Sequence, residues 1–417
     1  MFGEKTEIKN QSKENNLRIL VISQYFYPEN FRINDLCYGL LEKGCKVTVF
    51  TGKPNYPKGK FFKGYGYLSK GAEVINNISV IRSNLIPRGK GGGLSLFINY
   101  ISFVIFGIFK LFFLKGKYDK IFIYAPSPIT VGFLGILASK IFKAKSYLWV
   151  HDLWPESVKA AGGINNKIIL NLINEMTKFI YKLSDKILIQ SPKFSDYLIN
   201  QGVDKKKIIY YPYYAESFYK ETITSDEVKK SFSSDYLNIL FAGNIGVAQS
   251  FDTIIDAVNL INKEIKIKIT VLGDGRDKLR IINKIKKLNL NENFTFLGSF
   301  PPEKMPDFFS VADALLVTLK KSDIFSMTIP GKVQSYLACG KPIIGSLDGI
   351  GSEIINSASC GFSTNAESSK GLAESFLKFN ELSNNSKKNL GLNSRNYYEK
   401  EFEREKLLSK LIDIFKK

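Results

Sequence analysis

Short apolar runs alternate with amphipathic segments along the first half of the chain. The run "LRILVIS" predicts a buried strand over residues 18–23, and "FRINDLCYGLLEKG" predicts an amphipathic helix that ends at Gly44. The runs "KVTVF", "KIFIYA" and "SYLWV" read as further strands, with the helical segment "ITVGFLGILASKIF" before the last of them. Strands that alternate with helices indicate an α/β fold with a parallel sheet.

The same pattern restarts after an interruption. "LNILFAGNIG", "KITVLGDG", "FTFLGSF" and "DALLVTL" form a second series of strands, while the polar, Pro212-containing stretch "YYPYYAESFYKETITSDE" breaks the periodicity between the two series. We therefore expect two doubly wound domains, at 17–215 and 237–400, joined by a linker over 216–236. Residues 401–417 are expected to form a C-terminal helix that packs back toward the first domain, and the polar residues 1–16 a disordered tail.

One segment of the first half is long enough to cross a membrane. Residues 94–114, "LSLFINYISFVIFGIFKLFFL", carry a single charge, Lys110. Ser95, Asn99, Ser102 and Lys110 recur near helical spacing and form a narrow polar stripe. A membrane span here would separate strands that should share one sheet. Three interpretations remain open: a span, a core helix, and a helix lying in the membrane interface.

Charge is distributed unevenly between the two halves. The chain has a formal net charge of +20, and residues 1–215 hold 31 Lys and Arg against 14 Asp and Glu, whereas residues 216–417 hold 28 against 25. The basic first half predicts a surface that faces an anionic partner, either nucleic acid or acidic lipid. Because no RRM, KH or helix-turn-helix signature is present, we expect an anionic membrane surface and no nucleic acid.

Metal and disulfide chemistry are disfavoured by the composition. The four cysteines lack C-x-x-C spacing, and the chain has one histidine, so neither a zinc site nor a disulfide scaffold is expected. There is no D-x-D, no G-x-x-x-x-G-K-[ST] and no G-x-G-x-x-G after the first strand. These absences argue against a metal-bridged diphosphate, a P-loop NTPase and a Rossmann dehydrogenase. We expect no metal and no cofactor, in a protein of a reducing compartment.

Two glycine-containing loops follow strands of the second series. "LFAGNIGVAQSF" places Gly243, Asn244 and Gly246 before a helix, and "VLGDGRDKL" places Gly273, Asp274 and Arg276 in the same way. Glycines let a backbone approach a ligand closely, and a helix N-terminus offers free N–H groups to an anion. Plain strand-to-helix turns would give the same pattern, so both interpretations stand at this point.

A third element, "FSMTIPGKVQSYLACGKPIIGS", supports anion binding. Thr328 precedes a helix that starts near Lys332. A lysine in the first helical turn opposes the helix dipole by a few tenths of a kcal/mol. Its position there suggests an anionic partner such as a diphosphate, with a simple exposed lysine as the alternative.

The rarest side chains of the chain gather in "SYLWVHDLWPES". This window holds the single histidine, His151, both tryptophans, Trp149 and Trp154, and the acidic residue Asp152. In one interpretation His151 is a satisfied strand-end histidine and Asp152 a helix N-cap. In the other, both side chains lie at a reacting centre, while the tryptophans pack the strand end. Five further residues lie at other strand ends: Glu29, Asn30, Arg32, Asn55 and Tyr56.

These segments together resemble a known family. "QYFYPENFRIND", "HDLWPES", "FAGNIGVAQSFDTIIDA", "GDGRDKL", "FLGSFPPEKMPDFFSVADALLV" and "IPGKVQSYLACGKPI" are similar to GT-B glycosyltransferases of glycosyltransferase family 4. The likeness is strongest to the N-acetyl-L-fucosaminyltransferase-like enzymes of bacterial surface polysaccharide (O-antigen and capsule) synthesis. It implies two facing Rossmann-like domains with an interdomain cleft, of which the second binds a nucleotide sugar and the first binds the acceptor. It also implies metal-independent transfer with retention at the anomeric carbon.

The resemblance implies a function and assigns residues to it. The expected reaction moves a sugar, of HexNAc type, from a UDP donor to a polyprenyl-diphosphate-linked saccharide, on the cytoplasmic face of the membrane as a peripheral protein. The residues of the two glycine loops, with Thr328, Lys332, Gln334 and Ser335, would bind the donor. The five strand-end residues Glu29, Asn30, Arg32, Asn55 and Tyr56 would face the cleft and bind the acceptor. The family's leaving phosphate takes the acceptor proton, so His151 or Asp152 would orient the acceptor hydroxyl or stabilise positive charge at the anomeric carbon.

One departure from the family pattern keeps other functions open. The acidic positions of its E-x7-E motif are occupied here by Met327 and Ser335. Ser335 can still hydrogen-bond a ribose hydroxyl. A UDP-sugar 2-epimerase of the same fold and a non-catalytic UDP-sugar-binding partner subunit are the alternatives to the transferase.

Overall fold

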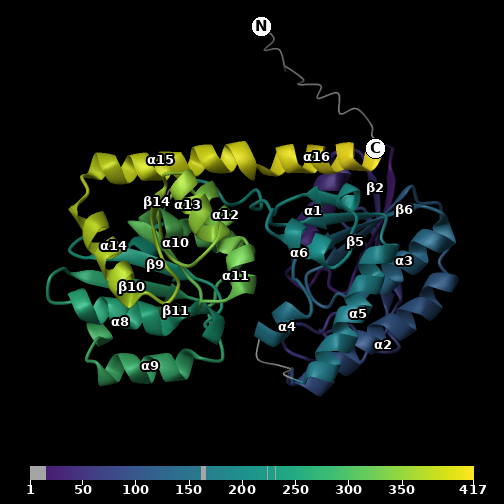
Figure 1. Cartoon of the computed structure of the whole chain (residues 1–417), viewed down its shortest axis with the longest axis horizontal. Helices are drawn as coiled ribbons and strands as arrows, with labels where there is room; N and C mark the ends of the chain where they lie inside the picture. The colour runs from purple at the N-terminus through teal and green to yellow at the C-terminus, as the bar shows by residue number, and fades with distance from the viewer. Residues whose placement is uncertain (1–15, 161–165, 223, 231) are drawn as a thin grey trace, which may run out of the picture.

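The chain folds into two domains, each built on its own largely parallel sheet (Figure 1). The structure is a computed structural model that describes residues 16–160, 166–222, 224–230 and 232–417. The tail expected over residues 1–16 thus lies outside the described residues, apart from Asn16.

The first domain has an eight-stranded sheet in the order β3-β4-β2-β1-β5-β6-β7-β8. Its strands are β1 (Arg18–Ser23), β2 (Lys46–Gly52), β3 (Ala72–Ile75), β4 (Ile78–Ser83), β5 (Lys120–Ala125), β6 (Lys145–Val150), β7 (Lys186–Ile189) and β8 (Ile208–Tyr210). All neighbours pair in parallel except β3, which runs antiparallel to β4 at the edge. The central strands β1, β5 and β6 are buried from their second residue on, because helices cover both faces of the sheet.

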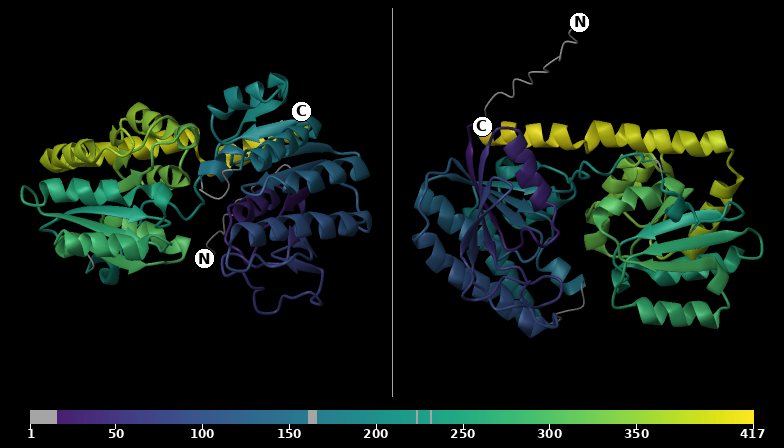
Figure 2. Two further views of the ribbon diagram at one scale, coloured as in Figure 1. Left: turned by 60° about the horizontal axis from the view of Figure 1, so that its bottom comes forward. Right: turned by 180° about the vertical axis from the view of Figure 1, so that it is seen from behind.

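Two cores flank this sheet. The helices of the domain are α1 (Ile33–Glu42), α2 (Gly93–Phe112), α3 (Val131–Phe142), α4 (Glu156–Ala160), α5 (Lys167–Leu183), α6 (Phe194–Asn200) and η1 (Lys205–Lys207). Helices α2, α3 and α5 pack side by side over one core, and α1 packs with the C-terminal helix over the other (Figure 2). Among the described residues, α2 is the one helix long and apolar enough to cross a membrane.

The second domain has a six-stranded parallel sheet in the order β11-β10-β9-β12-β13-β14. Its strands are β9 (Leu237–Ala242), β10 (Ile267–Leu272), β11 (Phe294–Gly298), β12 (Ala314–Thr318), β13 (Ile343–Ser346) and β14 (Gly361–Thr364). Its helices, after α7 (Asp226–Lys229) in the linker, are η2 (Val247–Gln249), α8 (Phe251–Ile261), α9 (Lys278–Lys287), η3 (Asn291–Asn293), η4 (Pro302–Lys304), α10 (Met305–Val311), α11 (Asp323–Met327), α12 (Gly331–Ala338), α13 (Ile350–Ser357) and α14 (Ser369–Glu381).

The last two helices carry the chain back to the first domain. Helix α15 (Asn384–Glu401) lies on the second domain, and α16 (Arg404–Lys416) continues from it onto the first (Figure 1). Arg404 of α16 pairs with Asp35 at 2.9 Å and with Glu42 at 3.0 Å, both on α1. The side chain of Leu408 fills the space above Gly39, so α16 completes the core beneath α1.

Candidate active site

The two glycine loops of the second domain pack directly against each other. Gly243 and Gly273 both have positive φ, and a Cβ at Gly273 would lie 1.9 Å from the carbonyl oxygen of Gly243. The amide of Ile245 donates to the carbonyl of Asp274 at 2.8 Å. Only glycine permits this backbone contact. The sequence-predicted donor loops therefore form one surface, on which Gly243 and Asn244 are exposed.

Lys332 extends from the first turn of α12 to this surface. Its ammonium lies 3.7 Å from the ring centroid of Phe241 and would lie 3.2 Å from a Cβ at Gly243. The nitrogen is buried and has no hydrogen-bond partner among the described residues. Burial lowers the pKa of Lys332 to about 7. A buried ammonium without a partner is costly, and an anion on the glycine loops would supply the missing partner.

The other expected donor residues differ in how open they are. Asp274 and Arg276 are exposed, and Arg276 reaches the first domain, where a Cβ at Gly91 would lie 3.4 Å from its Nη2. Gln334 is completely buried, with its amide 3.1 Å from the carbonyls of Pro330 and Gly331. The structure thus holds Gln334 inside the domain rather than on the loop surface.

Two hydroxyls near α12 are already engaged. Thr328 donates its hydroxyl to the carbonyl of Ile324 at 2.8 Å. Ser335, at the position of the family's second glutamate, is buried and shares a hydrogen bond with the phenol of Tyr219. Met327, at the first position, packs against the core of the first domain. Neither position presents a carboxylate to a ribose or a sugar.

His151 lies at the carboxyl end of β6 inside an aromatic cluster. Its ring centroid is 4.3 Å from that of Trp149, 4.5 Å from Tyr213 and 4.7 Å from Tyr124. The residue is buried, and neither ring nitrogen has a hydrogen-bond partner among the described residues. Burial, together with the charge of Arg32, holds the pKa of His151 well below its ordinary value. It is therefore a neutral imidazole with unused hydrogen-bonding capacity, not the satisfied histidine of the packing interpretation.

Asp152 follows His151, and burial raises the pKa of its carboxyl to about 7. The alternative in which Asp152 caps a helix is contradicted, because α4 begins only at Glu156. The tryptophans are packing residues. Trp149 donates its indole N–H to the carbonyl of Tyr211 at 3.0 Å, and Trp154 packs near the ring of Tyr100 at 6.5 Å.

Arg32 connects this end of β6 to the second domain. Its guanidinium lies 4.8 Å from the centroid of Tyr213, which also packs on His151. It donates to the carbonyl of Gly331 at 2.9 Å and to that of Tyr214 at 2.8 Å. Since Gly331 precedes Lys332, one chain of contacts joins the imidazole of the first domain to the start of α12. Two of the five N–H donors of Arg32 are thus occupied by backbone carbonyls.

The remaining acceptor candidates surround a buried carboxylate. One oxygen of Glu29 accepts from the backbone amides of Asn55 at 2.8 Å and Tyr56 at 2.7 Å, and its second oxygen has no described partner. Burial raises the pKa of Glu29 to about 7. Tyr56 is partly exposed beneath the guanidinium of Arg88, and Asn30 is exposed. The structure therefore brings Glu29, Asn55 and Tyr56 together and leaves Asn30 outside this contact.

Two residues beside His151 were not singled out from the sequence. Gln190 and Ser191 follow β7, the strand that pairs with β6, and both are buried with unpartnered side-chain atoms. The signal was present, because the apolar run "KILI" ends in two polar residues at the same sheet edge as His151. Carboxyl ends of parallel strands gather side chains from distant positions.

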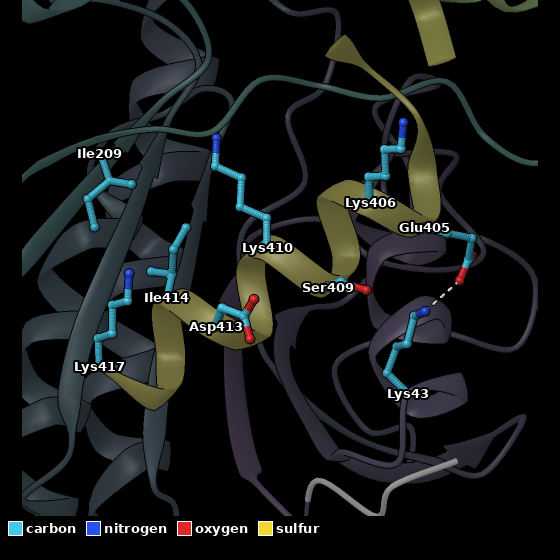
Figure 3. A pocket seen from close by; sticks show the side chains of 9 residues that line it. All are labelled: Lys43, Ile209, Glu405, Lys406, Ser409, Lys410, Asp413, Ile414 and Lys417. Atoms are coloured by element: carbon cyan, nitrogen blue, oxygen red, sulfur yellow. Dashed lines mark ion pairs between the residues drawn. The ribbon is translucent and has the colours of Figure 1, made fainter. Parts of the chain in front are cut away.

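Other features lie away from this region. No three His, Cys, Asp or Glu side chains of the described ranges are placed to hold a metal ion. A groove of about 690 Å³ runs along α16, lined by side chains that include Lys406, Lys410 and Asp413 (Figure 3). The ion pair drawn there joins Lys43 of α1 to Glu405 at 2.8 Å. This groove borders β8 and α16, and its lining includes neither His151 nor Lys332.

Comparison with known sequences gives a family match over the second domain. Residues 223–397 match the family of glycosyl transferases group 1. WbjE of Pseudomonas aeruginosa, named as a glycosyltransferase, is 24% identical over 214 residues, which cover 48% of this chain and 50% of WbjE. WcaI of Escherichia coli (strain K12), named as a colanic acid biosynthesis glycosyl transferase, is 23% identical over 339 residues, which cover 78% of this chain and 82% of WcaI. The chain thus spans half of one relative and most of the other.

Comparison with solved structures confirms the fold class. Sucrose-phosphate synthase from Thermosynechococcus elongatus superposes with a TM-score of 0.75 at 17% identity, covering 96% of this chain and 98% of that one. Anabaena HepE in complex with UDP superposes with a TM-score of 0.66 at 13% identity, covering 96% and 99%. Together with the two parallel-sheet domains, these likenesses show the expected GT-B fold.

Proposed function

We propose that this chain, whose residues 223–397 match the family of glycosyl transferases group 1, transfers a sugar from a nucleoside diphosphate to a lipid-linked saccharide in surface polysaccharide synthesis. The donor is a UDP sugar of HexNAc type, and the transfer retains anomeric configuration without a metal. Within the family, the enzyme belongs with the N-acetyl-L-fucosaminyltransferase-like members of family 4. The observation that carries the proposal is the unpartnered ammonium of Lys332 above the paired glycine loops.

The donor site follows from that ammonium. A diphosphate seated on Gly243 and Asn244 would receive a charge-assisted hydrogen bond from Lys332 and backbone contacts from the loop. Arg276 stands beside the loop without an ion pair to any described residue and can meet further phosphate charge. The presence of UDP in the similar HepE structure supports this choice of nucleotide. A lysine and backbone amides can balance a leaving diphosphate where no metal ligands gather.

The reacting groups come from the first domain. His151 is neutral and unpartnered, and it is tied through Tyr213 and Arg32 to the residue before Lys332. A neutral imidazole can orient the acceptor hydroxyl by hydrogen bonding, and the carboxylate of Asp152 can stabilise positive charge at the anomeric carbon. The leaving phosphate then takes the acceptor proton, so neither residue has to act as a strong base.

The membrane part of the proposal is supported by the orientation of α2. Its polar residues Asn99 and Ser102 face inward, where Asn99 donates to Ile86 and accepts from Gln24. Its outer face carries apolar side chains, with Phe97 60% exposed and Phe109 64% exposed. An inward polar face and an outward aromatic face suit a helix that lies against lipid while it remains part of the domain. We propose that the protein is peripheral on the cytoplasmic face of the membrane.

A donor screen followed by an acceptor assay tests the function. Thermal stabilisation by UDP and UDP-HexNAc sugars, but not by GDP or ADP sugars, is expected. With a lipid-linked acceptor and a chelator present, the protein should then form a glycoside with the same anomeric configuration as the donor, as determined by NMR. Epimerised UDP sugar formed without acceptor would replace the proposal with the 2-epimerase. UDP binding without turnover would replace it with a non-catalytic subunit. Full solubility with no affinity for anionic vesicles at low salt would refute the membrane part.

A further inference from the structure

A cavity of about 360 Å³ opens beside α2 in the first domain, apart from the donor loops. Its walls come from the carboxyl ends of β2 and β4, the loop that follows β2, and the last turns of α2. Three cationic side chains line it, Lys53, Arg82 and Lys110, and no acidic residue does. The lining of the cavity is therefore positively charged.

The three cations differ in how their charge is met. Arg82 is buried and paired with Glu73. Lys53 is also buried, and its ammonium donates to the carbonyls of Gly66, Tyr67 and Ser69, the last two at 3.0 and 3.2 Å. Carbonyls satisfy hydrogen bonds without cancelling a full charge, so the charge of Lys53 stays uncompensated.

Lys110 adds a second uncompensated charge at the same place. Its ammonium lies over Gly71, where a Cβ would come within 2.5 Å of Nζ, and no described carboxylate pairs with it. Burial lowers the pKa of Lys53, and the charge of the nearby Lys110 lowers it further. Two like charges held together in a concave wall repel each other unless an anion joins them.

The other wall of the cavity is apolar and open. Three phenylalanines from α2 and the residue after it line the cavity together with Lys110. They are Phe106, Phe109 and Phe113, which are 41%, 64% and 83% exposed. The cavity therefore offers positive charge beside an exposed aromatic surface. Such a pairing fits an amphiphile with an anionic head and a hydrocarbon chain.

We propose that this cavity binds the diphosphate of the prenyl-linked acceptor, with Lys110 donating to the phosphate oxygens, Lys53 adding charge, and the first prenyl units lying on Phe109 and Phe113. The assignment rests on the proposed function, which it deepens by locating where the lipid-linked end of the acceptor is held. A phospholipid headgroup has similar chemistry, but a site used only for membrane adhesion would not have to lie along the helix that reaches the reacting centre.

Helix α2 provides that connection. Tyr100, on the same helix, packs near Trp154. Burial raises the pKa of the Tyr100 phenol, and the charge of Asp152 also contributes to this rise. Ten residues separate Tyr100 from Lys110, which is ~15 Å along a helix axis. A diphosphate at Lys110 and a reacting hydroxyl near Asp152 would thus be spanned by a short saccharide. Asn99 fixes α2 to the loop that carries Lys53 by donating to Asn55 at 3.4 Å.

Binding of geranyl diphosphate by the full chain tests the proposal. Titration calorimetry is performed with saturating UDP, so that the donor site is blocked. The wild-type protein should bind geranyl diphosphate, and Lys110→Ala should weaken binding about tenfold, since a charge-assisted contact is lost. Lys117→Ala, which removes an equally charged but exposed lysine outside the cavity, should change binding less than about twofold. Phe109→Ala should reduce the advantage of geranyl diphosphate over inorganic diphosphate.

Equal weakening by Lys110→Ala and Lys117→Ala would overturn the proposal, as would absence of geranyl diphosphate binding in a protein that binds UDP. Sedimentation with phosphatidylglycerol–phosphatidylcholine vesicles separates the two sources of phosphate. If Lys110→Ala lost vesicle binding but kept its affinity for geranyl diphosphate, the cavity would be a headgroup site and the proposal would be wrong. Failure of UDP to bind would instead remove the proposed function, while the comparison of the two lysine variants would still decide this inference.

Discussion

Replacing Lys332 by methionine should change donor binding and stability in opposite directions. Methionine keeps an unbranched apolar stem above Phe241 and removes only the ammonium, which has no described partner in the unliganded protein. The free protein should therefore lose no hydrogen bond, and the cation–π contact with Phe241 is the attraction that it gives up. The complex with UDP should lose the side-chain cation that lies over Gly243.

The two effects can be estimated separately. Burial holds the pKa of Lys332 at about 7 instead of 10.5, which corresponds to at most about 5 kcal/mol of destabilisation at pH 7. Methionine should remove part of this cost and raise the melting temperature. A charge-assisted hydrogen bond contributes about 1.5–3 kcal/mol, so the Kd for UDP should rise roughly 10- to 150-fold. Charging the half-ionised amine at pH 7 costs under about 0.5 kcal/mol and hardly offsets this.

The pH dependence gives the same mechanism a second readout. Because the pKa of Lys332 is lower in the folded chain than in the unfolded chain, the unfolded chain binds the proton more strongly between about pH 7 and 10.5. Stability from this group therefore rises with pH in that range. UDP affinity should fall over the same range, since the free amine loses its charge. Both slopes should disappear in Lys332→Met.

Calorimetric titration with UDP and thermal unfolding across pH measure both effects. Lys341→Met is the matched control, because Lys341 is a second lysine of the same domain whose pKa burial lowers, but its ammonium donates to the carbonyl of Ser310 at 3.1 Å. It should lose stability and keep its UDP affinity. If Lys332→Met bound UDP as tightly as the wild type, the donor site would lie elsewhere and the reasoning would be refuted.

Three further predictions concern the first domain and its contact with the second. His151→Ala should lower turnover roughly 10²-fold or more with UDP affinity little changed, as measured by steady-state kinetics and titration. Full activity of this variant would show that the imidazole only packs the strand end. Asp152→Ala should lower turnover by a similar factor. In the wild type, kcat/KM should rise as pH passes about 7 and the raised pKa of Asp152 is crossed, and a pH profile of Asp152→Asn that kept this rise would assign it to another group. Arg32→Met removes the hydrogen bonds to Gly331 and Tyr214. Small-angle scattering should therefore show a wider separation of the domains, and kcat/KM should fall about tenfold. Unchanged scattering and kinetics would show that these hydrogen bonds are dispensable.

The fold was predictable where the pattern was strong, and the hairpin at the sheet edge shows what was missed. Strands β3 and β4 are joined by Asn76 and Asn77, whose φ angles of 46° and 65° are those of a tight hairpin turn that asparagine tolerates. The dipeptide in "VINNISV" was a usable signal. The flanking runs alternate weakly because β3 is an edge strand, with Val74 72% exposed, so hydrophobicity alone did not mark it.

The site was predictable in part for a similar reason. The two glycine loops directly follow neighbouring parallel strands, whose carboxyl ends meet at one sheet edge, so their common surface could be anticipated. The burial of Gln334 could not be anticipated from the sequence. Successive side chains on a helix differ in direction by about 100°, and only packing decides which of them faces the core. The unpaired state of His151 also needed coordinates, since it depends on Tyr124 and Tyr213, which approach from separate strands and segments.

The return of α16 to the first domain restricts how the two domains can move. The polypeptide passes between the domains twice, near Ala215 and again near Phe402, and the two passages are held together where the phenol of Tyr398 donates to the carbonyl of Ala215 at 3.3 Å. A pair of adjacent tethers allows swinging about one line and opposes free swivelling. In the proposed reaction, each cycle of donor entry and nucleotide release would then repeat a single arc, and His151 and Lys332 would return to the same relative position at every closure.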